Sequence, residues 1–125
     1  MSDRYISNYY TLEGRVAVKV APQALAGRPS QAERTVAKTT VGNVLVSTVF
    51  LIVDHQLGDG PPLLFETMVF GGELDQEQER CSTWEEAEVM HKIMCERVEA
   101  ATEIGRFRQA LRARRVSENE EGRDK

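Results

Sequence analysis

Hydrophobic positions are densest between residues 44 and 70, where two apolar segments flank one polar segment. The first, Val44–Val53, is almost continuously apolar and rich in β-branched residues, a pattern typical of a strand covered on both faces. The second, Leu63–Phe70, is apolar except at Glu66 and Thr67. Residues 54–62 are polar and rich in Gly and Pro, which predicts a connection. We therefore expect 44–53 at the centre of a sheet, with 63–70 beside it.

Two further segments predict flanking strands. Valines alternate with more polar residues over 16–20, which indicates a strand with one apolar face. Arg34–Val41 is a polar-faced strand followed by Gly42 and Asn43, and Gly at the first loop position suits a type II′ hairpin turn. We expect 34–41 to pair antiparallel with 44–53. The N-terminal strand then completes an antiparallel sheet of about four strands.

A long helix is predicted to follow the sheet. Residues 73–80 are polar and fit either a loop or a short helical turn. The pairs Ser82/Glu85 and Thr83/Glu86 both have the spacing of a capping box, which marks a helix N-terminus. Apolar residues then recur at every third or fourth position, which predicts one buried helix face. This stripe consists of Trp84, Ala87, Met90, Met94, Val98, Ala101, Ile104, Phe107 and Leu111.

The expected fold is therefore α+β: an antiparallel sheet of about four strands followed by a long C-terminal helix. The helix is expected to reach about Arg115. A kink is plausible near Gly105, because glycine costs about 1 kcal/mol relative to alanine in a helix. We interpret 1–116 as a single domain and 117–125 as a charged, disordered tail.

Composition narrows the class of protein. The chain has 125 residues, 41% of them hydrophobic, and a formal net charge of -4, which disfavours binding to duplex nucleic acid. No apolar run is long enough for a signal peptide or a membrane span, so we expect a cytoplasmic protein. The two cysteines, Cys81 and Cys95, and two distant histidines fit neither a disulfide framework nor a metal site.

Charge along the predicted helix is segregated. Its first part carries glutamates and its last part carries arginines: Glu85, Glu86, Glu88, Glu96, Glu99 and Glu103, then Arg106, Arg108, Arg112, Arg114 and Arg115. This order complements the helix dipole and fits a solvated face. It also fits an end that binds an anion or a partner, and the length of the helix suggests that its far end packs on another subunit.

Four polar residues in or beside the apolar segments are candidates for chemistry. Asp54 and His55 could serve in acid–base chemistry, but neighbours on an extended backbone point opposite ways, so a turn or subunit contact is the preferred interpretation. Glu66 must be paired if it is buried, and is interpreted as an edge or interface residue or as a contact to a polar ligand. His91 lies near the buried stripe, either as a satisfied core histidine or pointing into a site at the helix–sheet seam.

The most suggestive short motif is Phe70-Gly71-Gly72. Two glycines allow the backbone to approach a ligand and present amides to it. The aromatic ring beside them could stack on a base. The sequence has neither a P-loop nor a Rossmann fingerprint.

Several of these stretches together resemble a known family. They are VSTVFL at 46–51, Asp54-His55, GPPLLFETMVFGG at 60–72, Glu79-Arg80 and STWEEAE at 82–88 followed by His91. In this order they are similar to the Thoeris anti-defence sponge family of phages. The resemblance covers 36–98, and the chain departs from the family pattern at Ile52-Val53, Cys81 and Met90.

The resemblance implies a phage protein without catalytic activity, cofactor or metal, acting in the host cytoplasm. Such a protein binds glycocyclic ADP-ribose, and in some members cyclic oligonucleotides at a separate site. Family members form a homodimer or hexamer, with ligand held between protomers. The resemblance places ligand binding at Phe70, Gly71, Gly72 and His91. Arg80 and Arg97 are assigned to the ligand phosphates because of their charge, and basic Arg34 and Lys38 are a weaker candidate for the second nucleotide site.

Two other functions fit the same sequence. A small protein-binding module would inhibit a host protein through its C-terminal helix and arginine-rich end. A small hydrolase would use Asp54 and His55, although no nucleophile with a recognisable setting accompanies them.

Overall fold

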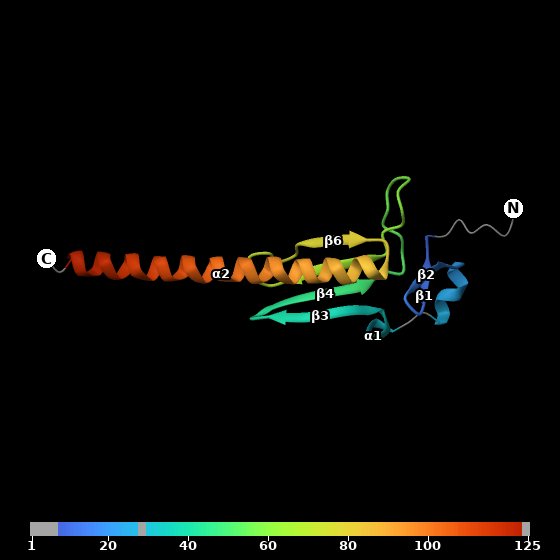
Figure 1. Cartoon of the computed structure of the whole chain (residues 1–125), viewed down its shortest axis with the longest axis horizontal. Coiled ribbons are helices and arrows are strands. Elements are labelled where there is room, and N and C mark those ends of the chain that lie inside the picture. Colours follow the sequence, from blue (N-terminus) through green and yellow to red (C-terminus); the bar gives the residue numbers. More distant parts are fainter. Residues whose placement is uncertain (1–7, 28–29, 124–125) are drawn as a thin grey trace.

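The computed structural model describes residues 8–27 and 30–123, the last seven of these by their backbone only. The fold is α+β, as predicted: a four-stranded antiparallel sheet followed by a long C-terminal helix (Figure 1). The elements in chain order are β1 (Tyr10–Glu13), β2 (Val16–Lys19), the 3-10 helix η1 (Pro22–Gly27), α1 (Gln31–Arg34), β3 (Thr35–Val41), β4 (Val44–Phe50), β5 (Phe65–Phe70), β6 (Gln78–Cys81) and α2 (Trp84–Arg123).

The larger sheet has the order β3-β4-β5-β6, with every neighbouring pair antiparallel. The predicted central strand and both of its predicted neighbours are confirmed. Val41 pairs with Val44, so Gly42 and Asn43 form a two-residue turn. Gly42 has φ +61°, the positive φ that the first position of a type II′ turn requires.

The fourth strand differs from the prediction. The predicted N-terminal strand forms as β2, but it pairs with β1 in a separate two-stranded hairpin. Its place in the larger sheet is taken by β6, in a segment expected to be a loop or helical turn. The reason is that β6 has the sequence QERC, which lacks the apolar alternation that identifies a strand. The antiparallel backbone pairing with β5, and not the pattern of its side chains, holds β6 in the sheet.

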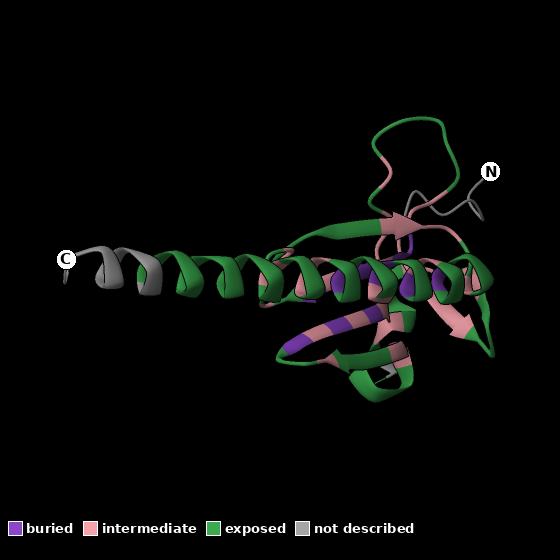
Figure 2. Cartoon of the chain, turned by 60° about the vertical axis from the view of Figure 1, so that its left-hand side comes forward, coloured by how far each residue is buried: buried purple, intermediate pink, exposed green. Residues whose placement is uncertain are grey.

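One face of the sheet is buried beneath the first half of α2. Val44, Val46 and Val69 pack there against Met94 and Val98, and a second cluster around Phe50 and Phe65 is covered by the β1-β2 hairpin and Trp84. Along β4 the residues facing α2 are buried, whereas those between them are only half-buried (Figure 2). Within this one chain, β4 is therefore fully covered on its helix side alone, and not on both faces as predicted.

Helix α2 is much longer than the sheet. Its 40 residues span about 60 Å, whereas the seven residues of β4 span about 23 Å, the length of about 15 helical residues. The helix therefore projects beyond the sheet (Figure 1). The predicted buried stripe is correct for Ala87, Met94 and Val98 but wrong further along. Ile104, Phe107 and Leu111 are exposed, because no strand extends far enough to cover them.

The helix also continues further than predicted. It passes through Gly105 without interruption and keeps its direction there, so the kink does not occur (Figure 1). A β-carbon at Gly105 would lie 3.2 Å from Oε1 of Glu73, so glycine gives that side chain room. The predicted disordered tail is helical over 117–123, a stretch without proline in which glutamates favour helix. Residues 124–125 lie outside the described part of the chain.

Candidate functional site

His91 is a core residue held by hydrogen bonds. Its side chain is only 7% exposed, and its Nδ1 and Nε2 lie 2.7 Å and 2.8 Å from the hydroxyls of Thr48 and Thr39. Thr48 also shares a hydrogen bond with Thr67 on the next strand. Burial lowers the pKa of His91 below its usual value of 6.5. Both ring nitrogens are engaged within the fold, so the interpretation as a satisfied core histidine holds.

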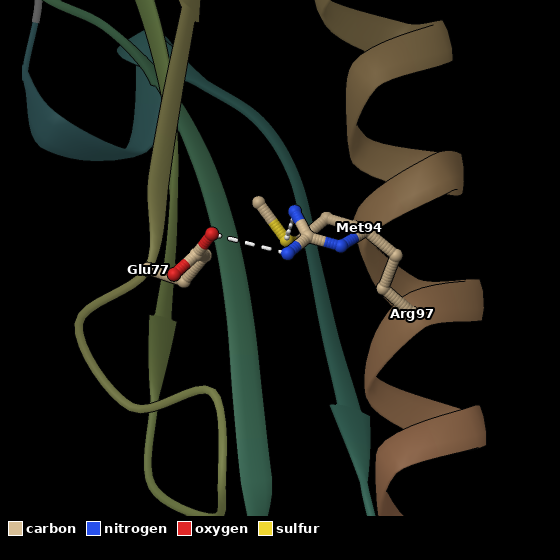
Figure 3. A network of polar contacts seen from close by, with 3 residues as sticks. All are labelled: Glu77, Met94 and Arg97. Carbon is tan, nitrogen blue, oxygen red and sulfur yellow. Dashed lines mark hydrogen bonds and ion pairs between the residues drawn. The ribbon is translucent and has the colours of Figure 1, made fainter.

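The two arginines assigned to phosphate are each bound to a carboxylate. Arg80 Nε donates to Glu66 Oε2 at 3.0 Å, which supplies the partner that half-buried Glu66 requires. Arg97 reaches from α2 to Glu77, donating from Nη2 to Oε1 at 3.0 Å, with Nη1 3.5 Å from the sulfur of Met94 (Figure 3). Arg80 therefore connects β6 to β5, and Arg97 connects α2 to the residue that precedes β6.

The Phe70-Gly71-Gly72 motif forms the end of β5 and the turn after it. Phe70 pairs with Leu45 on the sheet face away from α2, and its side chain is 46% exposed. Gly71 and Gly72 have φ +98° and +70°, and the Gly71 amide donates to Asp75 at 2.7 Å. The glycines therefore make a tight turn, and Phe70 leaves an aromatic ring on the open face of the sheet.

The residues of the weaker second site serve different purposes. Arg34 Nη1 donates to the carbonyl of Phe50 at 3.3 Å, so this side chain is engaged in the fold. Lys38 is exposed on β3. The structure shows no contact that brings these two side chains together in the described part of the chain.

Asp54 closes the loop that follows the central strand. Its Oδ1 accepts hydrogen bonds from the amides of Gln56 at 2.7 Å and Leu63 at 2.9 Å. His55 is exposed, and no hydrogen bond joins the two side chains among the described residues. Of the two roles expected here, a turn or a subunit contact, these hydrogen bonds give Asp54 the turn-forming one.

A hollow of about 510 Å³ lies where both hairpin turns at one end of the sheet meet α2. We call it the basic hollow. The β3-β4 turn and the turn after β5 form one side, and the start of the projecting half of α2 forms the other. Its lining residues are Val41, Gly42, Asn43, Val44, Gly72, Glu73, Ala101, Thr102, Gly105, Arg106, Arg108, Gln109 and Arg112.

The basic hollow carries an excess of positive charge. Three arginines, Arg106, Arg108 and Arg112, line it against one carboxylate, Glu73, whose Oε1 lies 3.7 Å from Arg108 Nη1. No ion pair joins Arg106 or Arg112 to a carboxylate in the described part of the chain. Gln109 and Asn43 add amide groups that both donate and accept. This combination suits an anion that also carries hydrogen-bonding groups.

A second depression has the opposite character. This apolar groove, of about 570 Å³, runs between α2 and β6. Val89, Met90, Ile93 and Met94 line it, with Glu79, Glu85, Glu86 and Arg97 around them. Three carboxylates against one arginine disfavour a phosphate, so the apolar groove suits an apolar partner.

The sequence located the arginine-rich end of the helix but not the hollow that it helps to form. Of the predicted ligand residues, only Gly72 lines the basic hollow. The location of the hollow could have been predicted, because in an antiparallel sheet of successive hairpins every second turn lies at the same end. Gly42 and Gly72 therefore had to lie near each other, and the helix had to pass them.

Comparisons with known proteins give no further assignment. No family model, curated protein or solved structure matches this chain. In residues 8–27 and 30–123, no group of three or more His, Cys, Asp or Glu side chains could hold a metal ion. In the same residues, no helix is both long and apolar enough to cross a membrane.

Proposed function

We propose that this protein binds a small cyclic nucleotide signal and sequesters it without cleaving it. The resemblance to the Thoeris anti-defence sponge family names the ligand as glycocyclic ADP-ribose, with cyclic oligonucleotides as a second class. In that role the protein is a phage product that acts in the host cytoplasm, assembled as a homodimer or hexamer.

The basic hollow is the observation that carries this proposal. Its volume of about 510 Å³ falls within the range of small-molecule sites. Arginine is the side chain best suited to phosphate, because its planar fork donates two parallel charge-assisted hydrogen bonds. Arg106 and Arg112 provide such groups beside glycine-containing turns, where backbone can approach a ligand closely.

Sequestration places a quantitative demand on the site. A sponge must compete with the receptor for the signal, which calls for nanomolar affinity, about -12 kcal/mol. Hydrogen bonds to charged groups contribute about 1.5–3 kcal/mol each, so the two arginines supply part of this affinity. Enclosure of the rest of the ligand, as between two protomers, supplies the remainder.

The test is recovery of intact ligand. Protein is incubated with glycocyclic ADP-ribose, the free ligand is measured in the filtrate, and the retained protein is then heated. We expect the ligand to leave the free pool and to return chemically unchanged on heating, as measured by mass spectrometry. Ligand that stays in the filtrate, or that returns as a cleavage product, would contradict sequestration.

Paired variants locate the site. Replacing both arginines (Arg106→Gln with Arg112→Gln) should weaken binding at least about 10-fold, because two charge-assisted contacts are lost. Arg15→Gln is the matched control, since Arg15 contacts Glu88 and Trp84 at the other end of the sheet. If the double variant binds as tightly as the unchanged protein, the basic hollow is not the site. Repeating the assay with a cyclic trinucleotide tests the second ligand class.

A protein-binding module is a second candidate, favoured by the exposed side chains of Ile104 and Phe107 on the projecting half of α2. It predicts capture of one host protein in stoichiometric amount, lost when the chain is truncated after Glu103. Failure to capture such a partner, together with binding of the nucleotide, would exclude this alternative.

A further inference from the structure

Strand β6 has one side without a partner strand. It ends the order β3-β4-β5-β6, so it pairs with β5 on one side, and no described strand lies beyond it (Figure 1). The Glu77 carbonyl accepts a hydrogen bond from the Val69 amide of β5 at 3.0 Å. Because successive residues of an antiparallel strand direct their backbone groups to opposite sides, Gln78 and Arg80 present theirs to the free edge.

The side chains of β6 leave this edge open. Arg80 is turned toward β5, where its Nε bonds to Glu66, so it does not cross the free edge. Glu79 lines the apolar groove instead. The strand also carries neither proline nor lysine, which commonly protect an edge from pairing. An edge of this kind is a template for a strand from another chain.

The apolar groove lies between this edge strand and α2, and its spacing matches an extended peptide. Val89 and Ile93 are 59% and 51% exposed and lie one helical turn apart, about 6 Å along α2. Side chains on one face of a strand recur at every second residue, about 6.7 Å apart. Two apolar side chains of a strand paired with β6 would therefore contact Val89 and Ile93 in turn. Recognition by strand addition uses this combination, with backbone bonds for affinity and pockets for alternate side chains for specificity.

Charge around the apolar groove specifies a basic partner. Three carboxylates line it: Glu79, Glu85 and Glu86. The arginine beside them, Arg97, is already bound to Glu77 (Figure 3). Among the ion pairs of the described residues, none involves Glu79 or Glu85. Glu85 and Glu86 lie at the start of α2, so lysine or arginine is favoured where a peptide reaches this end of the groove.

We propose that β6 and the apolar groove form a docking site for an extended peptide segment of a partner protein, which pairs with β6 as a fifth, antiparallel strand. The peptide carries apolar side chains at two alternate positions, facing Val89 and Ile93. Because β6 runs toward the start of α2, an antiparallel peptide begins there, which places a lysine or arginine at its N-terminal end beside Glu85. The inference does not rest on the proposed function, because it uses neither the basic hollow nor a nucleotide.

Binding is tested on the complete chain, without nucleotide, by fluorescence anisotropy. The probes are labelled hexapeptides that begin with lysine and then alternate threonine with valine, isoleucine, leucine or phenylalanine. We expect saturable binding of at least one probe, weakened at least about 10-fold when its lysine is replaced by glutamate. Absence of binding by every probe, or an affinity that the glutamate leaves unchanged, would overturn the proposal.

Strand addition is tested by amide hydrogen exchange with the bound probe. The amides of Gln78 and Arg80 should exchange at least about 10-fold more slowly, because they gain partners at the free edge. The Glu79 amide, which faces β5, is the internal control and should change little. Binding that leaves the exchange of Gln78 and Arg80 unaltered would overturn pairing with β6.

Matched variants locate the site. Ile93→Glu should raise the dissociation constant of the probe at least about 10-fold, because it places a charge in the apolar contact. Ile104→Glu is the control, since Ile104 is equally exposed on the same helix, 49% against 51%, but lies outside the groove. Glu85→Lys should shift the preference toward the glutamate probe. Equal effects of the two isoleucine variants would overturn the proposal. Binding that weakens as protein concentration rises would also overturn it, because a second copy would then occupy the groove.

Discussion

At the scale of single residues, the hydroxyl of Thr48 connects the centre of the sheet to the helix. It contacts both Thr67 and His91, and Thr39 closes the chain of hydrogen bonds on the other ring nitrogen. Such a network in a buried layer fixes how the helix sits on the sheet, because each group loses a partner if the helix shifts. Polar residues among apolar ones in β4 and β5 therefore have a structural explanation.

This burial predicts how stability depends on pH. The pKa of His91 is lowered in the folded chain, so between that value and the ordinary 6.5 the unfolded chain binds a proton that the folded chain does not. The free energy of unfolding should therefore decrease as pH falls from 7 to 5. Urea denaturation at both pH values measures the decrease, which should be smaller in His91→Gln.

His55 provides the control for this experiment, since it is the other histidine of the sequence and lies exposed in a loop. His55→Gln should keep the decrease seen in the unchanged protein. An acid-dependent decrease that His91→Gln retains in full would assign it to other groups.

Gly72 predicts a second single-residue effect. Its φ is +70°, and a β-carbon there would lie 2.7 Å from Cγ2 of Val44, so Gly72→Ala meets both backbone strain and a clash. Gly42→Ala is the matched control, because φ is +61° but no atom lies within 4 Å of the added carbon. We expect Gly42→Ala to cost about 1–2 kcal/mol of unfolding free energy and Gly72→Ala distinctly more. Equal costs in thermal or urea unfolding would show that Val44 moves aside freely.

At the scale of elements, the start of α2 is fixed by one of the two capping boxes that the sequence offers. The Glu86 amide donates to the hydroxyl of Thr83 at 3.1 Å, and Glu86 Oε1 accepts from the Thr83 amide at 3.1 Å. This is the reciprocal pair that defines the capping box. Sequence spacing alone allowed Ser82 equally, and the observed bonds select Thr83.

Thr83→Ala should therefore lower the free energy of unfolding by about 1 kcal/mol, within the range of 0.5–2 measured for lost caps. Ser82→Ala should have a much smaller effect, because its hydroxyl has no reciprocal bond to Glu85 in the described structure. Chemical denaturation of both variants measures the difference. Equal losses from both substitutions would indicate that the helix starts one residue earlier in solution.

At the scale of the whole molecule, local patterns predicted the fold well and long-range placement less well. The hairpin at Gly42 and the start of α2 depend on a few neighbouring residues, so their signals are in the sequence. Strand β6 depends on a ladder to β5, and the exposed end of α2 depends on where the sheet stops. Neither dependence leaves a local pattern, which is why the fourth strand and the far end of the buried stripe were mispredicted.

The same difference between local patterns and long-range placement explains why the sequence predicted only part of the candidate site. The arginine-rich end of α2 is visible in the sequence as charge segregation. The basic hollow requires in addition that two turns 30 residues apart, at Gly42 and Gly72, meet the helix at one end of the sheet. Arg80 and Arg97 had suitable charge but lie beside carboxylates that the fold brings to them.

One wall of the basic hollow belongs to the part of α2 that projects beyond the sheet. Any contact that fixes the direction of this projecting segment also fixes the distance between Arg112 and the turns opposite. If the protein forms the proposed homodimer and binds the proposed nucleotide, thermodynamic linkage requires that the effect of subunit association on nucleotide affinity equal the effect of nucleotide on association. The overhang of a single helix would then make the capacity to hold a signal depend on the concentration of the protein itself.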